Sequence, residues 1–238
     1  MILIPWHIAV LIPARNEEVL LPRCLESVLD ACQQLPPLVT WDIIVAVDSS
    51  TDLTHEIAEH TLSGCGAVLT TKAQSVGEAR RLAARKALER YAGSLSRCWL
   101  ANTDADCFVP QSWLVDQLEI ATRGRDAVAG IVDVDSFEDH AAEVQPRFRA
   151  SYQINLDGTH PHVHGANLGM RADAYLRAGG WSDLKTAEDH DLWNRLLATG
   201  SRRQSIATMQ VITSGRRVGR APHGFAESLS AYNEVRFE

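Results

Sequence analysis

The 238-residue sequence has no run of lysine or arginine and no charged tail, and its formal net charge is −7. Proteins that bind nucleic acid contact the phosphates through a basic face, so this charge pattern argues against nucleic acid as the main partner. A small molecule that carries phosphate is still compatible with the charge, because a metal ion can hold it. Hydrophobic residues make up 45% and charged residues 22% of the chain, as in an ordinary globular domain.

Paired cysteines and membrane-length apolar runs are missing as well. The five cysteines are scattered and none forms a C-x-x-C pair, so we interpret them as reduced thiols of a cytoplasmic protein. The first residues, MILIPWHIAVLIPARNEE, are apolar but lack a basic leader and a small-residue cleavage site. Pro5, Pro13 and the charges from Arg15 onward leave this run too short to span a bilayer. We therefore expect a first β-strand there and no transmembrane segment.

Short apolar runs alternate with helix-like segments through the first half of the chain. The four predicted strands cover residues 8–14, 41–48, 66–71 and 97–104. A helix is predicted after each strand, and the last of these helices is entered through Pro110 at its first turn. This alternation is typical of an α/β fold with a mostly parallel central sheet and helices on both faces. Since no repeat or linker interrupts the chain, we expect a single domain over residues 1–238.

Polar groups follow each predicted strand. Right-handed crossovers place the loops after parallel strands at one edge of the sheet, so these groups should converge on one crevice. The groups are Arg15-Asn16-Glu17, Asp48, Lys72 and Asp104-Ala105-Asp106.

Asp104 and Asp106 stand one residue apart, directly after an apolar strand. Two close carboxylates repel each other, and a hard divalent cation such as Mg²⁺ or Mn²⁺ offsets that cost because it accepts oxygen ligands. Such an ion is commonly shared with substrate phosphates. The alternative is a loop in which an aspartate caps the following helix.

Asp48 and a basic helix start are further candidates. An aspartate at the end of a strand can accept a hydrogen bond from a ribose hydroxyl or a base N–H, whereas capping of the next helix fits Asp52 better. Gly77 precedes a helix with Arg80 in its first turn, and helix N–H groups plus an arginine suit a diphosphate. We assign that role to Arg80 and, with less support, to Lys72; the other basic residues of the helix fit a solvated face.

An acidic cluster, Glu188, Asp189 and Asp191, opens another predicted helix. Negative charge is favourable at a helix N-terminus, but capping explains one acid and not three. A carboxylate at this place could serve as the general base toward an acceptor hydroxyl.

Histidines gather in the second half. His160, His162 and His164 would share one face of a strand, where either a zinc site or a solvated loop would account for them, although no cysteine or acid has matching spacing. His223 lies between Pro222 and Gly224, and this turn would hold the imidazole rigidly as a metal ligand. Because nitrogen is a softer ligand than carboxylate oxygen, His223 would favour Mn²⁺ over Mg²⁺.

Taken together and in order, six segments resemble the family 2 glycosyltransferases, which have the GT-A nucleotide-sugar fold. They cover residues 8 to about 200. The segments are VLIPARNEE, IIVAVDSSTDLT, GEARRLA, NTDAD, GANLGMRADAYLRAGGW and AEDHDLWNRLLATG.

The resemblance implies a metal-dependent, non-processive enzyme that transfers a sugar from a UDP- or GDP-sugar to an acceptor hydroxyl. It implies a nucleotide-binding half at residues 1–125 and a donor-sugar and acceptor half at 126–238. Asp189, next to Glu188, would be the general base of an inverting displacement. By the same resemblance, the nucleotide pocket is lined by Pro13, Ala14, Arg15 and Glu17, the base is contacted by Asp48, and the ribose lies by Asp104. The diphosphate side is formed by Lys72, Gly77 and Arg80. The metal is bound by Asp106, with Asp104 and His223 as further ligands, and the donor sugar lies over Gly165, Ala166 and Asn167.

Departures from the family pattern keep alternatives open. The second strand ends in VDSS, where many relatives have two adjacent aspartates, and the Q-x-x-R-W motif of processive synthases is absent. Retaining GT-A enzymes that make small glycosides also use a late histidine as a metal ligand, so a retaining outcome is one alternative. A nucleotidyltransferase is another, although PARNEE lacks the glycine-rich basic loop of that class. The acceptor is not identified; residues 134–164 are expected to shape its pocket.

Overall fold

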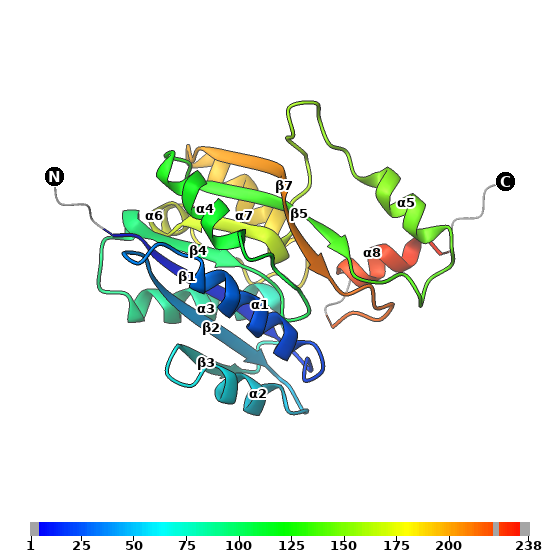
Figure 1. Cartoon of the computed structure of the whole chain (residues 1–238), viewed down its shortest axis with the longest axis horizontal. Helices are drawn as coiled ribbons and strands as arrows, with labels where there is room; N and C mark the ends of the chain where they lie inside the picture. Colours follow the sequence, from blue (N-terminus) through cyan, green and yellow to red (C-terminus); the bar gives the residue numbers. More distant parts are fainter. Residues whose placement is uncertain (1–4, 221–223, 234–238) are drawn as a thin grey trace.

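The computed structural model describes residues 5–220 and 224–233 and contains one seven-stranded sheet (Figure 1). The strands are β1 (His7–Ala14), β2 (Thr40–Asp48), β3 (Gly66–Thr71), β4 (Cys98–Asn102), β5 (Ala127–Val134), β6 (Leu168–Arg171) and β7 (Arg203–Thr213). They pair in the order β3-β2-β1-β4-β6-β5-β7. Among these described strands, β6 runs antiparallel to both of its neighbours and the other pairs are parallel. The predicted α/β class with a mostly parallel sheet is confirmed.

Helices cover both faces of this sheet (Figure 1). The α-helices are α1 (Leu21–Gln33), α2 (Thr54–Thr61), α3 (Val76–Arg90), α4 (Trp113–Thr122), α5 (Val144–Ser151), α6 (Ala172–Arg177), α7 (Glu188–Ala198) and α8 (Phe225–Ala231), and the short 3₁₀ turns are η1 (Leu95–Arg97) and η2 (Gly165–Asn167). None of the helices in the described part of the chain is long and apolar enough to cross a membrane.

The period of two in a β-strand divides the core between the two faces. Ile8, Val10 and Ile12 of β1 pack with α1, α2 and α4, whereas Ala9 and Leu11 pack with α3, α6 and α7. All eight residues of β1 are buried, which explains why its sequence is a continuous apolar run without polar alternation.

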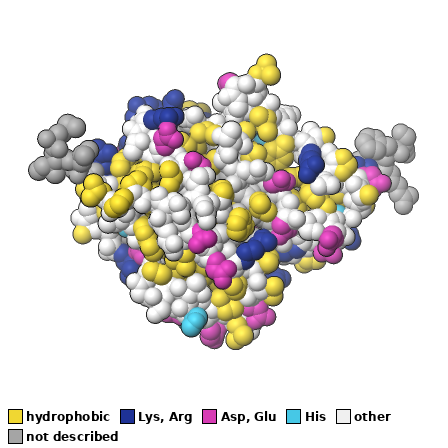
Figure 2. Space-filling model, in the orientation of Figure 1, with side chains coloured by type: hydrophobic (Ala, Val, Ile, Leu, Met, Phe, Trp, Pro, Cys, Tyr) yellow, Lys and Arg dark blue, Asp and Glu magenta, His cyan; other side chains and the backbone are white. Residues whose placement is uncertain are grey.

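A third, smaller cluster lies where α5 and α8 pack side by side, at one end of the molecule in Figure 1. Val144, Phe148 and Leu229 are its buried centre, together with Val134 at the end of β5. The outer surface carries both signs of charge, and acidic and basic side chains are interspersed on the face that Figure 2 shows.

Three local predictions are wrong in detail. Gly77 does not precede α3 but lies inside its first turn, because the Ser75 hydroxyl accepts the Glu78 N–H and caps the helix two residues earlier. The Pro110 turn ends at the Trp113 N–H, so α4 begins three residues after the proline. The segment with His160, His162 and His164 is irregular and not a strand.

Candidate functional site

The polar loops converge at the carboxyl edge of the sheet, as expected, and line a pocket there. The loops after β1, β3, β4 and β7, the end of β2 and the start of α3 all contribute to it. Its walls include Pro13, Ala14, Arg15, Glu17, Asp48, Gln74, Ser75, Asp104, Asp106, Lys185, Ser214, Arg216 and Arg220.

A second pocket adjoins the first and shares Asp104, Lys185 and Phe225 with it. Its walls include Arg80, Phe148, Tyr152, His162, His164, Gly165, Ala166, Glu188 and Asp189. The predicted nucleotide residues therefore line the first pocket, the predicted general base lines the second, and Asp104 lies between the two.

Backbone conformation is unusual along this edge. In the described part of the chain, the non-glycine residues with positive φ are Asn16, Ser49, Gln74 and Ala187. They follow β1 and β2 and precede α3 and α7, so all four lie in loops of the crevice. A left-handed residue that is not glycine costs about 1–2 kcal/mol, and neighbours compensate in part, since the Asn16 side-chain carbonyl accepts the Thr51 N–H at 2.8 Å. Such conformations are typical of functional sites, where the surrounding structure holds them.

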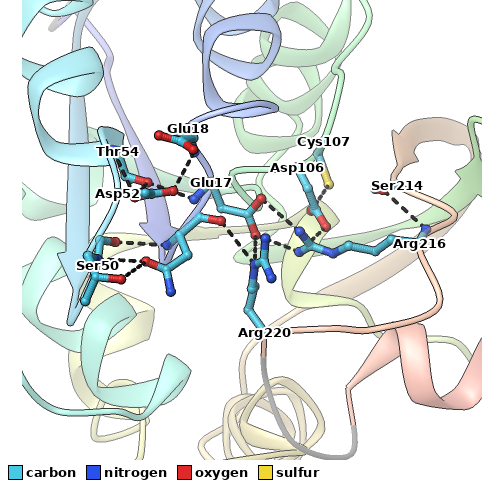
Figure 3. A network of polar contacts seen from close by, with 12 residues as sticks. Glu17, Glu18, Ser50, Asp52, Thr54, Asp106, Cys107, Ser214, Arg216 and Arg220 are labelled. Atoms are coloured by element: carbon cyan, nitrogen blue, oxygen red, sulfur yellow. Dashed lines mark hydrogen bonds and ion pairs between the residues drawn. The ribbon is translucent and has the colours of Figure 1, made fainter.

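Arg216, just after β7, bridges two acids in the first pocket (Figure 3). Its guanidinium donates to both carboxylate oxygens of Glu17 at 2.6 and 2.9 Å and lies 2.8 Å from Asp106 Oδ2. Arg220 reaches the same glutamate at 3.8 Å and donates to the Asn16 carbonyl at 3.1 Å. The segment after β7 is thereby attached to the loop after β1.

Asp106 is a mostly buried carboxylate in the wall of the first pocket. Burial raises the pKa of its carboxyl to about 6, while Arg216 acts in the opposite direction. Asp104 and Asp106 offer hard oxygen ligands, and a cationic side chain already contacts Asp106, so this pair fits Mg²⁺ or Mn²⁺. No group of three or more His, Cys, Asp or Glu residues within 5–220 and 224–233 is arranged to hold a metal. The predicted third ligand, His223, lies outside the described residues.

Arg80 makes the corresponding bridge in the second pocket. It pairs with Asp104 at 2.5 Å and with Glu188, and its guanidinium lies over the Trp181 ring, 5.2 Å from the ring centre. The Arg80 guanidinium also packs closely against the backbone of Gly165, where an added Cβ atom would collide with it. Arg80 therefore connects the D-x-D segment to the start of α7.

Asp189 is held in place by backbone groups. One carboxylate oxygen accepts the Gly165 N–H at 2.9 Å and the other accepts the N–H of His190 at 2.7 Å. Neither contact is to a cation, in contrast to Glu188, whose pKa is raised by burial while Arg80 opposes that shift. Asp189 is therefore the acid of this pair with a carboxylate available to a hydroxyl group.

Some predicted residues are placed differently from the rest. Lys72 is exposed and absent from both pocket walls, where Lys185 is found instead. Gly77 packs against the Ser182 carbonyl, and Asn167 is fully buried, accepting from Trp113 and donating to two backbone carbonyls.

Asp48 lines the first pocket but is also a structural residue. Its two carboxylate oxygens accept the N–H groups of Gln74 and Ser75 at 3.0 and 3.1 Å. It thus fixes the loop that leads into α3, a use that its position at a strand end did not reveal.

Sequence reasoning missed Arg216 and Lys185 in the first pocket and Tyr152 in the second. Arg216 follows the strand-like segment that ends near Thr213, and the rule that loops after parallel strands converge would have pointed to it. Lys185 and Tyr152 lie in irregular segments and have no comparable signal.

Two solved structures have a similar arrangement of elements. Residues 1–349 of TarS from S. aureus, solved in complex with UDP-GlcNAc, match with a TM-score of 0.67 at 15% identity, over 92% of this chain and 61% of that one. The mannosyltransferase PcManGT from Pyrobaculum calidifontis, solved with GDP-Man and Mn²⁺, matches with a TM-score of 0.64 at 18% identity, over 96% of this chain and 69% of that one. These likenesses confirm the expected GT-A fold.

The sequence itself gives a separate result. None of the curated proteins compared with it matches. The family model described as glycosyl transferase family 2 matches residues 9–177, which is most of the chain and contains the D-x-D segment. The chain therefore belongs to glycosyl transferase family 2.

Proposed function

We propose that this protein transfers a sugar from a nucleoside-diphosphate sugar, with UDP or GDP as the nucleotide, to an acceptor hydroxyl. The observation that carries the proposal is the position of the D-x-D segment at two adjoining pockets. Asp106 lines the pocket with the predicted nucleotide residues, and Asp104 lines both that pocket and the one with Asp189. Family membership supports the reaction class, and the ligands of the two similar structures, UDP-GlcNAc and GDP-Man, support the donor class.

The two halves of the chain would form a single domain in which each half binds a different part of the substrates. Residues 1–125 supply most of the first pocket, which would hold the nucleotide, and residues 126–238 supply most of the second, which would hold the donor sugar and the acceptor. Tyr152, His162 and Phe225 give the second pocket flat rings beside Asp189, and such surfaces contact the apolar faces of ring-shaped molecules.

Asp106 and Asp104 would hold a divalent cation, with His223 as a further ligand, and Mn²⁺ in the PcManGT structure is consistent with that choice. When bound, the cation would neutralise the negative charge that develops on the departing diphosphate.

Asp189 would act as the base of an inverting displacement. As the acceptor oxygen attacks the anomeric carbon, the bond from that carbon to the diphosphate oxygen breaks and the hydroxyl proton passes to the Asp189 carboxylate. The N–H groups of Gly165 and His190 hold this carboxylate at the wall of the second pocket. The Glu188 carboxylate is paired with Arg80, which leaves Asp189 as the member of the acidic pair that can take the proton.

The test is donor turnover. The purified protein is screened by thermal shift against UDP- and GDP-sugars with Mn²⁺, and a stabilising donor is then incubated with a panel of candidate acceptors. Release of UDP or GDP with the sugar on the acceptor is the expected result. A parallel incubation with UTP or GTP and a sugar 1-phosphate tests the alternative, because a nucleotidyltransferase would form the nucleotide-sugar there and release pyrophosphate. The anomeric configuration of the transfer product, read by NMR, separates an inverting from a retaining outcome.

A further inference from the structure

Arg216 lies between two mostly buried carboxylates, Glu17 and Asp106, and pairs with both. The Glu17 side chain is 5% exposed and the Asp106 side chain 13%, while the Arg216 side chain is 22% exposed. Removing one partner from a buried ionic group leaves an uncompensated charge, which is strongly unfavourable. The guanidinium is therefore the counter-cation of this pocket when no ligand is present.

The Asp106 carboxylate is needed for another purpose as well. Asp106 is the proposed ligand of the divalent cation, and Arg216 lies 2.8 Å from its Oδ2 atom (Figure 3). A guanidinium and a divalent cation repel each other and compete for one carboxylate. The cation can be coordinated by the whole Asp106 carboxylate only if Arg216 moves away from it.

A new partner for Arg216 would arrive with the cation. A divalent ion at Asp106 would bring the diphosphate of the donor to the same wall of the pocket, and a planar guanidinium is well suited to phosphate oxygens. The two contacts with Glu17, at 2.6 and 2.9 Å, can hold the guanidinium nearby while its remaining contact changes from the Asp106 carboxylate to the phosphate. The charges also balance, since the added cation replaces Arg216 at Asp106 and the diphosphate replaces Asp106 at Arg216.

We propose that Arg216 is an exchangeable counter-cation: it occupies Asp106 in the donor-free protein and moves to the diphosphate of the donor when a divalent cation takes that carboxylate. The inference rests on the proposed function, because it uses the same pocket and the same donor class. It adds a diphosphate-binding residue, and it implies that the metal binds weakly until a diphosphate draws Arg216 away.

Arg220 provides a matched control. It comes from the same segment and carries the same charge, and it contacts Glu17 and the Asn16 carbonyl; the contacts recorded for it do not include Asp106. Substituting it removes one positive charge from the pocket wall without freeing the Asp106 carboxylate.

The experiment measures binding in the absence of an acceptor. Mn²⁺ alone is titrated by calorimetry into the parent, Arg216→Ala and Arg220→Ala, and UDP and GDP are then titrated in the presence of saturating Mn²⁺. We expect Arg216→Ala to bind Mn²⁺ alone about tenfold more tightly, because the competitor is gone, and to bind the nucleoside diphosphate about 10–100-fold more weakly, because a charge-assisted contact is lost. We expect Arg220→Ala to change the affinity for Mn²⁺ alone by less than about threefold.

Opposite signs for the two ligands distinguish exchange from a structural role, which would weaken both. Weaker or unchanged Mn²⁺ binding in Arg216→Ala, or an equal gain in Arg220→Ala, would overturn the proposal. Arg216→Lys keeps the charge but not the planar fork; should the alanine variant fail to fold, the lysine variant is expected to give the same two signs with smaller changes, and parent-like values for it would count against the exchange. If the parent bound neither UDP nor GDP, the proposed function would be wrong, and the proposed contact between Arg216 and the diphosphate would be wrong as well. If the parent bound the nucleotide but Arg216→Ala had the same affinity for Mn²⁺ as the parent, only the exchange would be wrong.

Discussion

Arg80 and Arg216 each bridge two carboxylates, and each holds one member of the Asp104–Asp106 pair. The Arg80 side chain is 3% exposed, lies over Trp181 and is packed against Gly165, so the surrounding residues fix its conformation. The Arg216 side chain is 22% exposed and follows the end of an outer strand. The same ionic chemistry thus serves two purposes: a fixed connection around Arg80 and an exchangeable one around Arg216.

The difference follows from where the two regions lie in the fold. Arg80 is on a regular helix, α3, which has the sheet on one side and α7 on the other. Arg216 is on an irregular segment that the first pocket can reach. We infer that substitutions around Arg216 and Asp106 change ligand binding, whereas substitutions around Arg80 change the stability of the fold.

Loss of the Asp106 carboxylate should have the largest effect. Asp106→Asn is expected to abolish Mn²⁺-dependent binding of the nucleoside diphosphate while the protein still folds, because the side chain faces the pocket and its partner Arg216 keeps Glu17. Calorimetry with and without Mn²⁺ and a thermal melt measure the two properties. Unchanged nucleotide affinity in the presence of Mn²⁺ would remove Asp106 from the metal site.

The proposed base comes next. Asp189→Asn should lower kcat by about 10²–10⁴, the usual contribution of general base catalysis, with nearly unchanged donor affinity. Asp191→Asn is the matched control on the same helix, since Asp191 pairs with Arg195 and Ser182 and does not line the second pocket. A collapse of donor affinity with persistent turnover in Asp189→Asn would make this residue a binding group and favour the retaining alternative.

The fixed bridge should appear as a loss of stability. Arg80→Gln leaves Asp104 and Glu188 without their shared cation, and breaking a buried ionic group in this way costs about 3–5 kcal/mol. Arg81→Ala, its exposed neighbour paired with Glu78 on the same helix, should change the free energy of unfolding by no more than about 0.5 kcal/mol. Urea denaturation of both variants measures the difference; equal effects would mean that Arg80 is no more important to the fold than a surface residue.

The fold and the first pocket were largely predictable from the sequence. A strand buried on both faces must be a continuous apolar run, so β1, β2 and β4 are visible in the sequence, and parallel topology then dictates where their loops meet. Asp106 and Glu17 are therefore found near each other although 89 positions separate them in the sequence. The general base candidate came from a different signal: α7 begins with more acidic residues than capping of a helix needs.

The differences between prediction and structure have physical causes. Lys72 lies in the loop after β3 and its side chain is exposed, whereas Gln74 and Ser75 of the same loop line the first pocket; the sequence does not reveal which residue of a loop faces the pocket. Arg80 was assigned to the diphosphate because a helix N-terminus and an arginine suit phosphate. That role stays a prediction, and the structure adds three tertiary contacts, to Asp104, Glu188 and Trp181, that a local pattern could not reveal. The histidines of residues 160–164 alternate as in a strand, yet hydrogen bonds to side chains and loops hold them in an irregular segment.

The smallest expected effect concerns His164 in the second pocket. Its Nε2 atom lies 2.9 Å from the Tyr152 hydroxyl, which also accepts the Val132 N–H. Burial lowers the pKa of the His164 imidazole to about 4 from its ordinary value of 6.5; Asp189 acts in the opposite direction, and the neighbouring His162 lowers the pKa further. The folded state therefore holds neutral imidazole in a pH range where the unfolded chain binds a proton.

The sign of the pH dependence follows from this difference. The contribution of His164 to stability is complete above about pH 6.5 and is lost as the pH falls toward about 4, because the unfolded chain takes up the proton first. With a discount for the partial exposure of the ring, the loss is about 2 kcal/mol. Urea denaturation at pH 7 and pH 4.5 should therefore show a smaller decline for His164→Gln than for the parent, whereas the same change at the exposed His60 on α2 should leave the decline as it is. A parent-like decline in His164→Gln would mean that this imidazole is as easily protonated in the folded protein as in the unfolded chain, and that the second pocket is wetter than its aromatic walls indicate.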